Sequence, residues 1–168
     1  NRLVLVRYGE IILKGLNRPV FEDLLVKNIK QALKDECELK IYKAQATIYI
    51  EPKDDSCTES IVEKLKKVFG IVSIVVAYPA EKNMDDVEKQ IAENLASDLN
   101  AAKTFKVIAK RADKKFHMTS PQICEEIGGR ILERFPHLTV DVKNPEINVY
   151  VEIREHGYVH LDKIQGAG

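Results

Sequence analysis

The sequence predicts an α+β fold with two domains, each of them a β-sheet covered by helices. Segments in which polar and apolar residues alternate, as in strands, are separated by segments whose apolar residues recur at helical spacing. The length of 168 residues suits one or two small domains. We expect a first domain at residues 1–79, a second at 80–165, and the start of a linker at 166–168.

The first half begins with a strand, a helix and a hairpin. Residues 3–8 form an apolar run typical of a buried strand. Residues 17–35 show a helical apolar period, with Pro19 in the first turn. Residues 39–42 and 47–50 alternate like the two arms of a hairpin.

A second helix and a fourth strand complete this half. Ser56 and Glu59 have the spacing of a capping box, so the helix is expected to begin there and to end at Gly70. Residues 71–78 form the next strand. The order βαββαβ predicts a ferredoxin-like arrangement, in which two helices cover one face of an antiparallel sheet.

The second half alternates again, in the order αβαβββ. Asn83 is expected to cap a helix whose apolar face extends to Leu99. The next helix begins at Thr119, because Thr119, Pro121 and Gln122 together form a strong N-terminal signal. The expected strands are residues 105–110, 138–142, 146–154 and 158–164.

Charge is balanced over the whole chain but unevenly distributed. Lys and Arg number 26, as do Asp and Glu. Residues 103–118 nevertheless hold six basic residues against one acidic residue, and residues 1–34 hold seven against three. Two basic stretches in a neutral chain are typical of a protein that presents one face to a nucleic acid.

The cysteines and the apolar runs indicate the cellular compartment in which the protein is found. Cys37, Cys57 and Cys124 are far apart in the sequence, and no C-x-x-C motif occurs, so neither a disulfide nor a zinc site is predicted. No apolar run approaches 18 residues, and no signal peptide is visible. The sequence therefore predicts a cytoplasmic protein without a membrane partner.

The stretch from Thr104 to Arg134 has the strongest pattern for a binding site. A strand is followed by a basic loop, residues 111–117, and then by a helix N-terminus, where backbone N–H groups and the helix dipole favour anions. Repeated phosphate together with an exposed Phe116 indicates nucleic acid more than a single nucleotide. The alternative is a solvated charged surface with Phe116 in the core.

Gly128 and Gly129 interrupt the helix that follows the loop. Each glycine costs about 1 kcal/mol relative to alanine in a helix interior. Either close packing on a neighbouring element or the close approach of a ligand must offset that cost, and we expect packing.

The sequence shows no catalytic motif. It lacks a P-loop, an H-E-x-x-H zinc motif, a calcium-binding loop and a nucleophile elbow. No nucleophilic side chain can be paired with a general base from the sequence alone. We therefore expect the chain to bind without catalysing, with no catalytic, cofactor or metal residues of its own.

Two separated stretches resemble a known family. Residues 7–18, which read RYGEIILKGLNR, resemble the start of the tRNA 4-thiouridine synthetases, sulfurtransferases also linked to thiamine biosynthesis. Residues 105–114, with Asn144-Pro145 and residues 151–154, resemble the THUMP domain. This RNA-binding module is shared by thiouridine synthases, methylases and pseudouridine synthases. The resemblance covers essentially the whole chain, and only the first motif is specific to the synthetases.

The resemblance implies three parts in order: a ferredoxin-like domain, a THUMP domain and an ATP pyrophosphatase domain. The S-G-G-x-D-S adenylation loop of the third part does not occur in this sequence, so the chain is expected to be the substrate-recognition portion. The resemblance further implies that the whole protein uses ATP and Mg²⁺ to activate uridine 8 of tRNA. Sulfur would then come from a cysteine desulfurase. It implies a THUMP domain that holds the acceptor 3′ end, and it allows a homodimer.

Eight residues are expected to contact RNA: Lys110, Arg111, Lys114, Lys115, Phe116, Arg130, Lys14 and Arg18. The first three match motif positions of the THUMP domain. The next three are chosen for charge and placement, and the last two lie in the motif at residues 7–18.

Two alternatives stay open at this point. One is the RNA-binding half of another THUMP enzyme, a methyltransferase or a pseudouridine synthase, against which residues 7–18 argue. The other is a ferredoxin-like regulatory module that binds a small ligand or a protein. The salt dependence of binding distinguishes this regulatory module from an RNA-binding protein, because binding through phosphate contacts weakens steeply as salt rises and binding in an apolar pocket does not.

Overall fold

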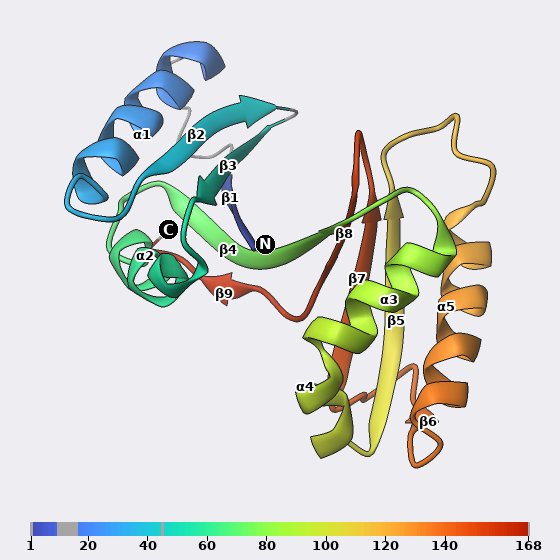
Figure 1. The fold of residues 1–168 in the computed structure, drawn as a ribbon. Helices are drawn as coiled ribbons and strands as arrows, with labels where there is room; N and C mark the ends of the chain where they lie inside the picture. Colours follow the sequence, from blue (N-terminus) through green and yellow to red (C-terminus); the bar gives the residue numbers. More distant parts are fainter. Residues whose placement is uncertain (1, 10–16, 45, 168) are drawn as a thin grey trace. The chain divides into compact units, whose positions relative to one another are not determined.

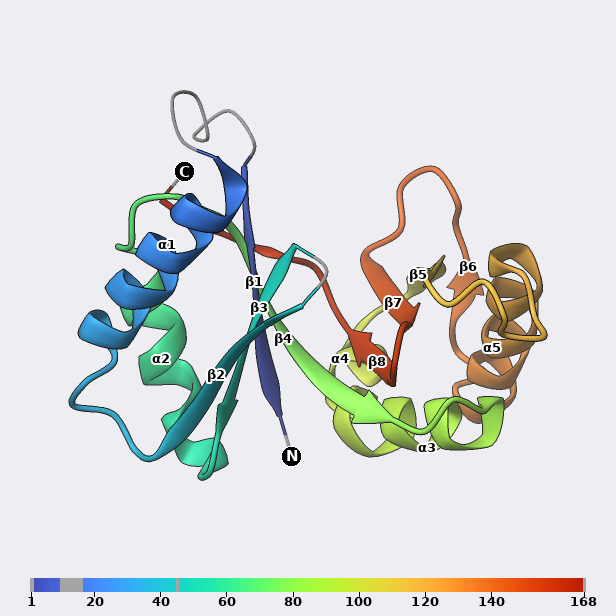
Figure 2. The same cartoon turned by 90° about the horizontal axis from the view of Figure 1, so that it is seen from above.

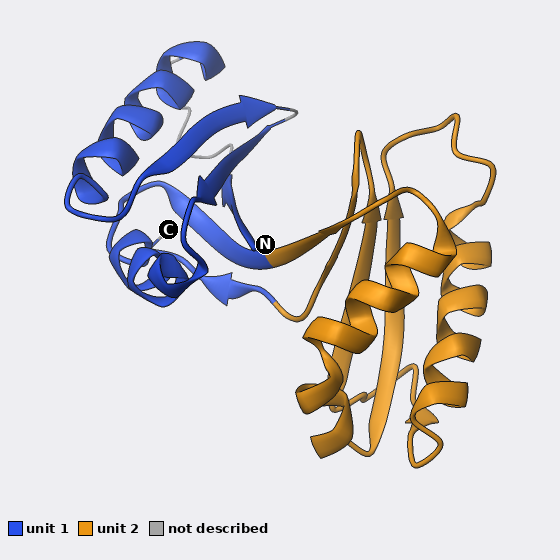
Figure 3. Cartoon of the chain, viewed as in Figure 1, with its two compact units in different colours: residues 1–76, 163–168 blue, residues 77–162 orange. Residues whose placement is uncertain are grey.

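The computed structural model describes residues 2–9, 17–44 and 46–167, and the chain forms two compact units (Figures 1 and 3). Unit 1 comprises residues 1–76 and 163–168, and unit 2 comprises residues 77–162. The end of the chain returns to unit 1 because β9 (Ile164–Gln165) pairs antiparallel with β4 (Ile71–Ala80) at Ser73 and Ile74. The predicted α+β class is confirmed.

Unit 1 has the predicted βαββαβ order. Its elements are β1 (Leu3–Tyr8), α1 (Arg18–Ala32), β2 (Leu39–Ala44), β3 (Thr47–Pro52), α2 (Thr58–Leu65) and β4. The strand order is β2-β3-β1-β4, with antiparallel pairing of β3 to both β2 and β1. Figure 2 shows α1 and α2 on the same side of this sheet. The ferredoxin-like arrangement is therefore confirmed.

The core of unit 1 forms where the apolar periods of helices and strands meet. Phe21, Leu25 and Ile29 of α1 are buried at helical spacing, as are Ile61 and Leu65 of α2. They pack in one cluster with buried residues of β1 and β3. Burial of these side chains, worth roughly 1.5–3 kcal/mol each, holds the helices on the sheet.

Two expectations for unit 1 are wrong. The helix start at Ser56 is replaced by a short 3₁₀ turn, Asp55–Cys57, because the Asp54 side chain accepts from the Ser56 amide at 2.9 Å and organises the turn instead. No disulfide was expected, yet Cys37 and Cys57 are joined as one, with Cα atoms 6.4 Å apart. Folding brings these cysteines together across a sequence separation of 20 residues.

Unit 2 contains α3 (Met84–Asn94), α4 (Ala96–Ala101), β5 (Thr104–Arg111), α5 (Ser120–Arg134), β6 (Thr139–Val140), β7 (Ile147–Ile153) and β8 (Gly157–His160). The end of β4 pairs with β8, and the order continues as β8-β7-β5-β6. β5 runs parallel to both β7 and β6, whereas β7 and β8 are antiparallel. The single helix expected up to Leu99 is instead divided between α3 and α4 at Leu95.

The helices of unit 2 cover one face of its sheet (Figures 1 and 2). Val87 and Ile91 of α3 join a buried cluster with Phe105 of β5, Val149 of β7 and the isoleucines of α5. Alternate residues of β5 and β7, including Lys110 and Tyr150, therefore point to the opposite face. None of the described helices is long and apolar enough to cross a membrane.

Candidate nucleic-acid interface

Arg111 bridges the basic loop after β5 through two hydrogen bonds. Its Nη1 atom donates to the carbonyl oxygen of Lys114 at 2.9 Å and to that of Phe116 at 3.4 Å. The amides of Ala112 and Asp113 donate to the Ile153 carbonyl at the end of β7. The loop is thus tied to itself and to the sheet, which reduces the entropy lost when a ligand binds.

Asp113, the acidic residue within the loop, supports its shape. Its carboxylate accepts from the Lys82 ammonium at 2.5 Å and from the Lys115 amide at 3.0 Å. The hydrogen bond from Lys82 and that from the Lys115 amide keep the pKa of Asp113 below its ordinary value. The negative charge of the loop is therefore neutralised locally, and the lysines that follow remain as the outward charge.

Lys114 and Lys115 are the exposed cations of this loop. Within the described residues, neither ammonium group has an ion pair. Phe116, by contrast, is half-buried, packs against the core of unit 2 and contacts the His117 ring at a centroid distance of 4.6 Å. The expectation of an exposed Phe116 is corrected, because the loop folds its ring toward the sheet.

The N-terminus of α5 is capped as the sequence predicts. The Thr119 hydroxyl accepts from the Gln122 amide at 3.3 Å, and the Gln122 side chain accepts from the Thr119 amide at 2.8 Å. Pro121 lies in the first turn. The lysines of the loop thus precede a fixed helix N-terminus, whose remaining amides and dipole favour an anion.

Lys110 lies on an aromatic surface that sequence reasoning did not find. Its Nζ atom is 5.9 Å from the centre of the Tyr150 ring, which stacks on the His160 ring at 4.8 Å. His160 is buried and contacts Glu152 at 2.6 Å through Nε2. Burial raises the pKa of the Tyr150 hydroxyl. Lys110 is therefore half-buried and positioned by its neighbours rather than free in solvent.

The Arg130 guanidinium is engaged by carboxylates. It donates to Glu126 at 2.7 Å, to Asp85 at 2.8 Å and to Glu88 at 2.9 Å, and so ties α5 to α3. Arg134 also binds Glu88, at 2.6 Å. The hydrogen bonds from Arg134 and Arg130 hold the pKa of Glu88 below its usual value. Arg130 thus has a structural role, which leaves it less charge to offer to a phosphate.

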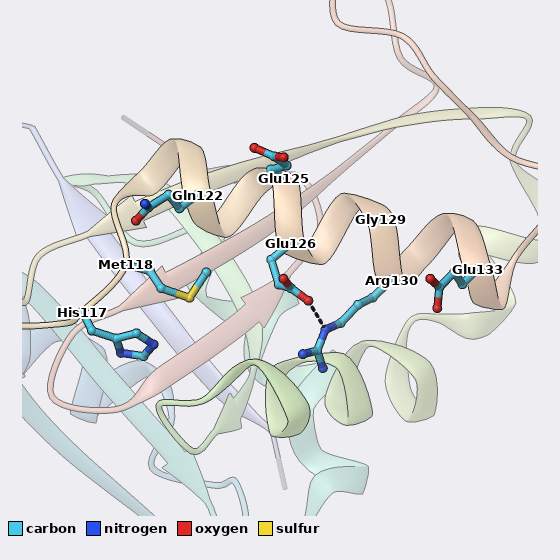
Figure 4. Close-up of a pocket in the computed structure, with 8 residues that line it drawn as sticks. All are labelled: His117, Met118, Gln122, Glu125, Glu126, Gly129, Arg130 and Glu133. Carbon is cyan, nitrogen blue, oxygen red and sulfur yellow. Dashed lines mark hydrogen bonds and ion pairs between the residues drawn. The ribbon is translucent and has the colours of Figure 1, made fainter.

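A polar pocket of about 560 Å³ lies along α5 (Figure 4). His117, Met118 and Gln122 line its end near the helix N-terminus, whereas three glutamates, Glu125, Glu126 and Glu133, line the rest with Gly129 and Arg130. The carboxylates repel phosphate, so an RNA backbone is favoured only at the His117 end.

Gly128 and Gly129 contradict the packing expectation. A Cβ atom added at either position would meet nothing within 4 Å. Ile127 and Ile131 turn toward the core, which leaves the glycines on the outer side of α5. Both glycines line a second, mainly apolar pocket of about 450 Å³ together with Leu132, Val140 and Val142.

The two candidates in unit 1 are less defined. Lys14 lies outside the described residues. Arg18, the first residue of α1, donates to Glu22 at 3.3 Å on the exposed helix surface. The structure therefore brings together Arg111, Lys114, Lys115 and Phe116 at one loop, whereas the Lys110 side chain lies over Tyr150 on the open face of the sheet. Arg130 lies further along α5, and Arg18 belongs to the other unit.

Two domain families match this chain in the order that the fold indicates. Residues 3–75 match the ThiI ferredoxin-like domain, and residues 81–162 match the THUMP domain. The chain thus contains a ferredoxin-like domain of the ThiI type followed by a THUMP domain. Over nearly its whole length, more particularly, it is similar to part of proteins named probable tRNA sulfurtransferase.

The similar proteins are longer than this chain. Those named probable tRNA sulfurtransferase from Acetivibrio thermocellus and Alkaliphilus metalliredigens are 44% and 45% identical to it. The matches cover 98% and 99% of this chain but 43% of each relative. The crystal structure of a 4-thiouridine synthetase–RNA complex with bound ATP superposes with a TM-score of 0.85 at 33% identity, over 98% of this chain and 42% of that one.

The PH1313 protein of Pyrococcus horikoshii superposes equally well. Its TM-score is 0.85 at 30% identity, over 99% of this chain and 55% of that one. TrmN from Thermus thermophilus, at 17% identity and a TM-score of 0.67, shares the fold.

The described residues do not fit ATP or a metal ion. Their adjacent glycine pair, Gly128-Gly129, lies inside α5 and not in a loop before a helix N-terminus, where amides could bind phosphates. Among the described residues, no group of three or more His, Cys, Asp or Glu side chains could hold a metal.

Proposed function

We propose that this chain binds tRNA as the recognition portion of a sulfurtransferase that makes 4-thiouridine at position 8. The observation that carries the proposal is the basic loop at residues 111–117, which is tied down by Arg111 and leads into the capped N-terminus of α5. A THUMP match covers the same residues, and a similar protein of known structure is an RNA complex.

The unpaired 3′ end of tRNA is the part that we assign to this loop. Lys114 and Lys115 supply exposed charge, and the helix N-terminus supplies amides, so one or two phosphates in series fit here. A single-stranded end follows such a local site more readily than a rigid duplex, because its backbone can bend to it.

For the whole protein, we propose the chemistry implied by the family resemblance. ATP with Mg²⁺ would activate the uridine in a further domain, a cysteine desulfurase would supply sulfur, and the protein would act in the cytoplasm on tRNA. A homodimer and a role in thiamine synthesis are further parts of this proposal. The chain itself is expected neither to hydrolyse ATP nor to thiolate tRNA.

The test compares three RNAs for binding to the purified chain by fluorescence anisotropy. They are an intact tRNA transcript, the same tRNA without its unpaired 3′ nucleotides, and a blunt duplex of the acceptor stem. Loss of the 3′ nucleotides should weaken binding, because it removes the phosphates that Lys114, Lys115 and the helix N-terminus would contact. Equal affinity for the intact and shortened tRNA would contradict the assignment of the 3′ end.

A further inference from the structure

Phe69 is the most exposed large apolar side chain among the described residues, with 72% of its surface accessible. It lies in the turn at residues 66–70, between α2 and β4 of unit 1. The aromatic ring therefore contributes little to the core of this unit.

The backbone of the turn that carries Phe69 is anchored on both sides. Val68 and Ile71 on either side of it are buried, and the Val68 and Ile71 amides donate to the carbonyls of Leu65 and Val68. Gly70 adopts a φ of 100°, which favours glycine, and a Cβ atom there would lie 3.2 Å from the Phe21 ring. The backbone of the turn thus directs Phe69 outward, where its ring is accessible to an unpaired base.

Lysines surround this turn in the sequence. Lys64 binds Glu36, and Lys66 binds Glu63 at 2.7 Å. Lys67 is exposed, and within the described part of the chain it has no ion pair. An outward aromatic ring two residues from an uncompensated cation is the combination that single-stranded nucleic acid uses, with stacking on the ring and a phosphate at the cation.

We propose that Phe69 is a second RNA contact, located in unit 1, where its ring stacks on an unpaired base and Lys67 contacts the adjoining phosphate. The inference rests on the proposed tRNA binding and adds a site that the basic loop of unit 2 does not include. Val72, the nearest exposed apolar residue in sequence, is 43% exposed. Val20 and Leu24 of α1, in the same unit, are also 49% and 48% exposed. Lys67, which has no ion pair within the described residues, favours a phosphate-bearing partner beside the ring, so RNA is the better occupant.

The test uses variants that separate an aromatic role from an apolar one. Phe69→Leu and Phe69→Ala should weaken tRNA binding about five- to a hundredfold, because they remove a stacking face. Phe69→Trp should bind as well as the parent chain. Val72→Ala is the matched control and should leave affinity unchanged. Thermal melts of all four should agree with the parent, since Phe69 is exposed.

Ultraviolet crosslinking gives a second readout. The parent chain, irradiated with bound tRNA and digested, should yield a nucleotide-modified peptide that contains Phe69. Parent-like affinity of Phe69→Leu and Phe69→Ala, with no such peptide, would overturn this inference and leave the tRNA proposal intact. If Phe69→Leu and Val72→Ala lose tRNA binding equally, the aromatic ring has no effect beyond that of its apolar surface and the stacking role is wrong. If the parent chain does not bind tRNA, both proposals fail.

Discussion

Arg111 donates a 2.9 Å hydrogen bond from Nη1 to the backbone carbonyl of Lys114, and so closes the loop that carries the exposed lysines. The residue that sequence reasoning chose as a phosphate contact thus also shapes the loop. Its Nη1 atom makes both loop contacts, and within the described residues its other guanidinium donors have no partner. The two roles predict different behaviour for Arg111 and for Lys114.

Arg111→Ala should weaken tRNA binding more than Lys114→Ala, because it removes a charge and also frees the loop. The backbone amides of residues 112–117 should exchange with deuterium faster in Arg111→Ala than in the parent chain. In Lys114→Ala their exchange rates should equal those of the parent. Arg111→Lys should restore charge but only part of the affinity, since an ammonium group lacks the forked geometry. Full affinity in Arg111→Lys would show that the loop closure is irrelevant to binding.

The capping box of α5 predicts a stability effect. Thr119→Ala should lower the free energy of unfolding by about 1 kcal/mol, because the Gln122 amide loses its partner at the helix N-terminus. Thr119→Ser keeps the hydroxyl and is the matched control. Urea denaturation followed by circular dichroism measures both. Equal stability of the two variants would contradict a role for the cap.

The cluster that joins α3 and α5 predicts a pH dependence. The pKa of Glu88 is lowered in the folded state, so its contribution is present above its ordinary value of 4.5 and is lost as pH falls through the folded value. Glu88→Gln should lower the stability of unit 2 by about 0.5–1 kcal/mol at neutral pH. The difference between parent and variant should shrink as the pH falls below 4.5 and through the lowered folded-state pKa of Glu88. A difference that is constant between pH 7 and pH 3 would exclude this cause.

Gly128→Ala and Gly129→Ala should stabilise the chain, each by about 0.5–1 kcal/mol. Both positions lie in a helix interior, and a Cβ atom at either one enters open space. Melting temperature and tRNA affinity should be measured together. A more stable variant with weaker tRNA binding would identify these glycines as a point of close ligand approach. A less stable variant would contradict the open surroundings found here.

Most of the fold could be predicted because it depends on local patterns. The Thr119–Gln122 capping box and the helical apolar periods are readable from residues a few positions apart. Predictions failed where another nearby residue or turn determined the local structure instead of the expected signal. The expected helix start at Ser56 gave way to a turn organised by Asp54, and the helix ending near Leu99 divided at Leu95.

The candidate site could be predicted only in outline. The order strand, basic loop and helix N-terminus is visible in sequence, and it located the loop correctly. Which side chains face one another depends on strand register and on helix packing. The register of β5 with β7 places Lys110 opposite Glu152, and α3 brings Glu88 to Arg130; neither follows from spacing along the chain. The Cys37–Cys57 pair was missed for the same reason.

The central claim is that the loop lysines contact phosphates, and salt dependence tests it most directly. Binding of tRNA should be measured from about 50 to 300 mM salt for the parent, for Lys114→Ala with Lys115→Ala, and for Lys53→Ala as the control. Lys53 pairs with Glu38 in unit 1 and is separated in sequence from the basic loop at residues 111–117 and from Phe69.

Each phosphate contact contributes roughly 0.7–0.9 to the slope of log K against log salt. The double variant should therefore bind more weakly, with a slope smaller by up to about 1.4–1.8, while Lys53→Ala keeps the parent slope and affinity. If the double variant keeps both, the loop is only a solvated charged surface and the proposed interface is wrong.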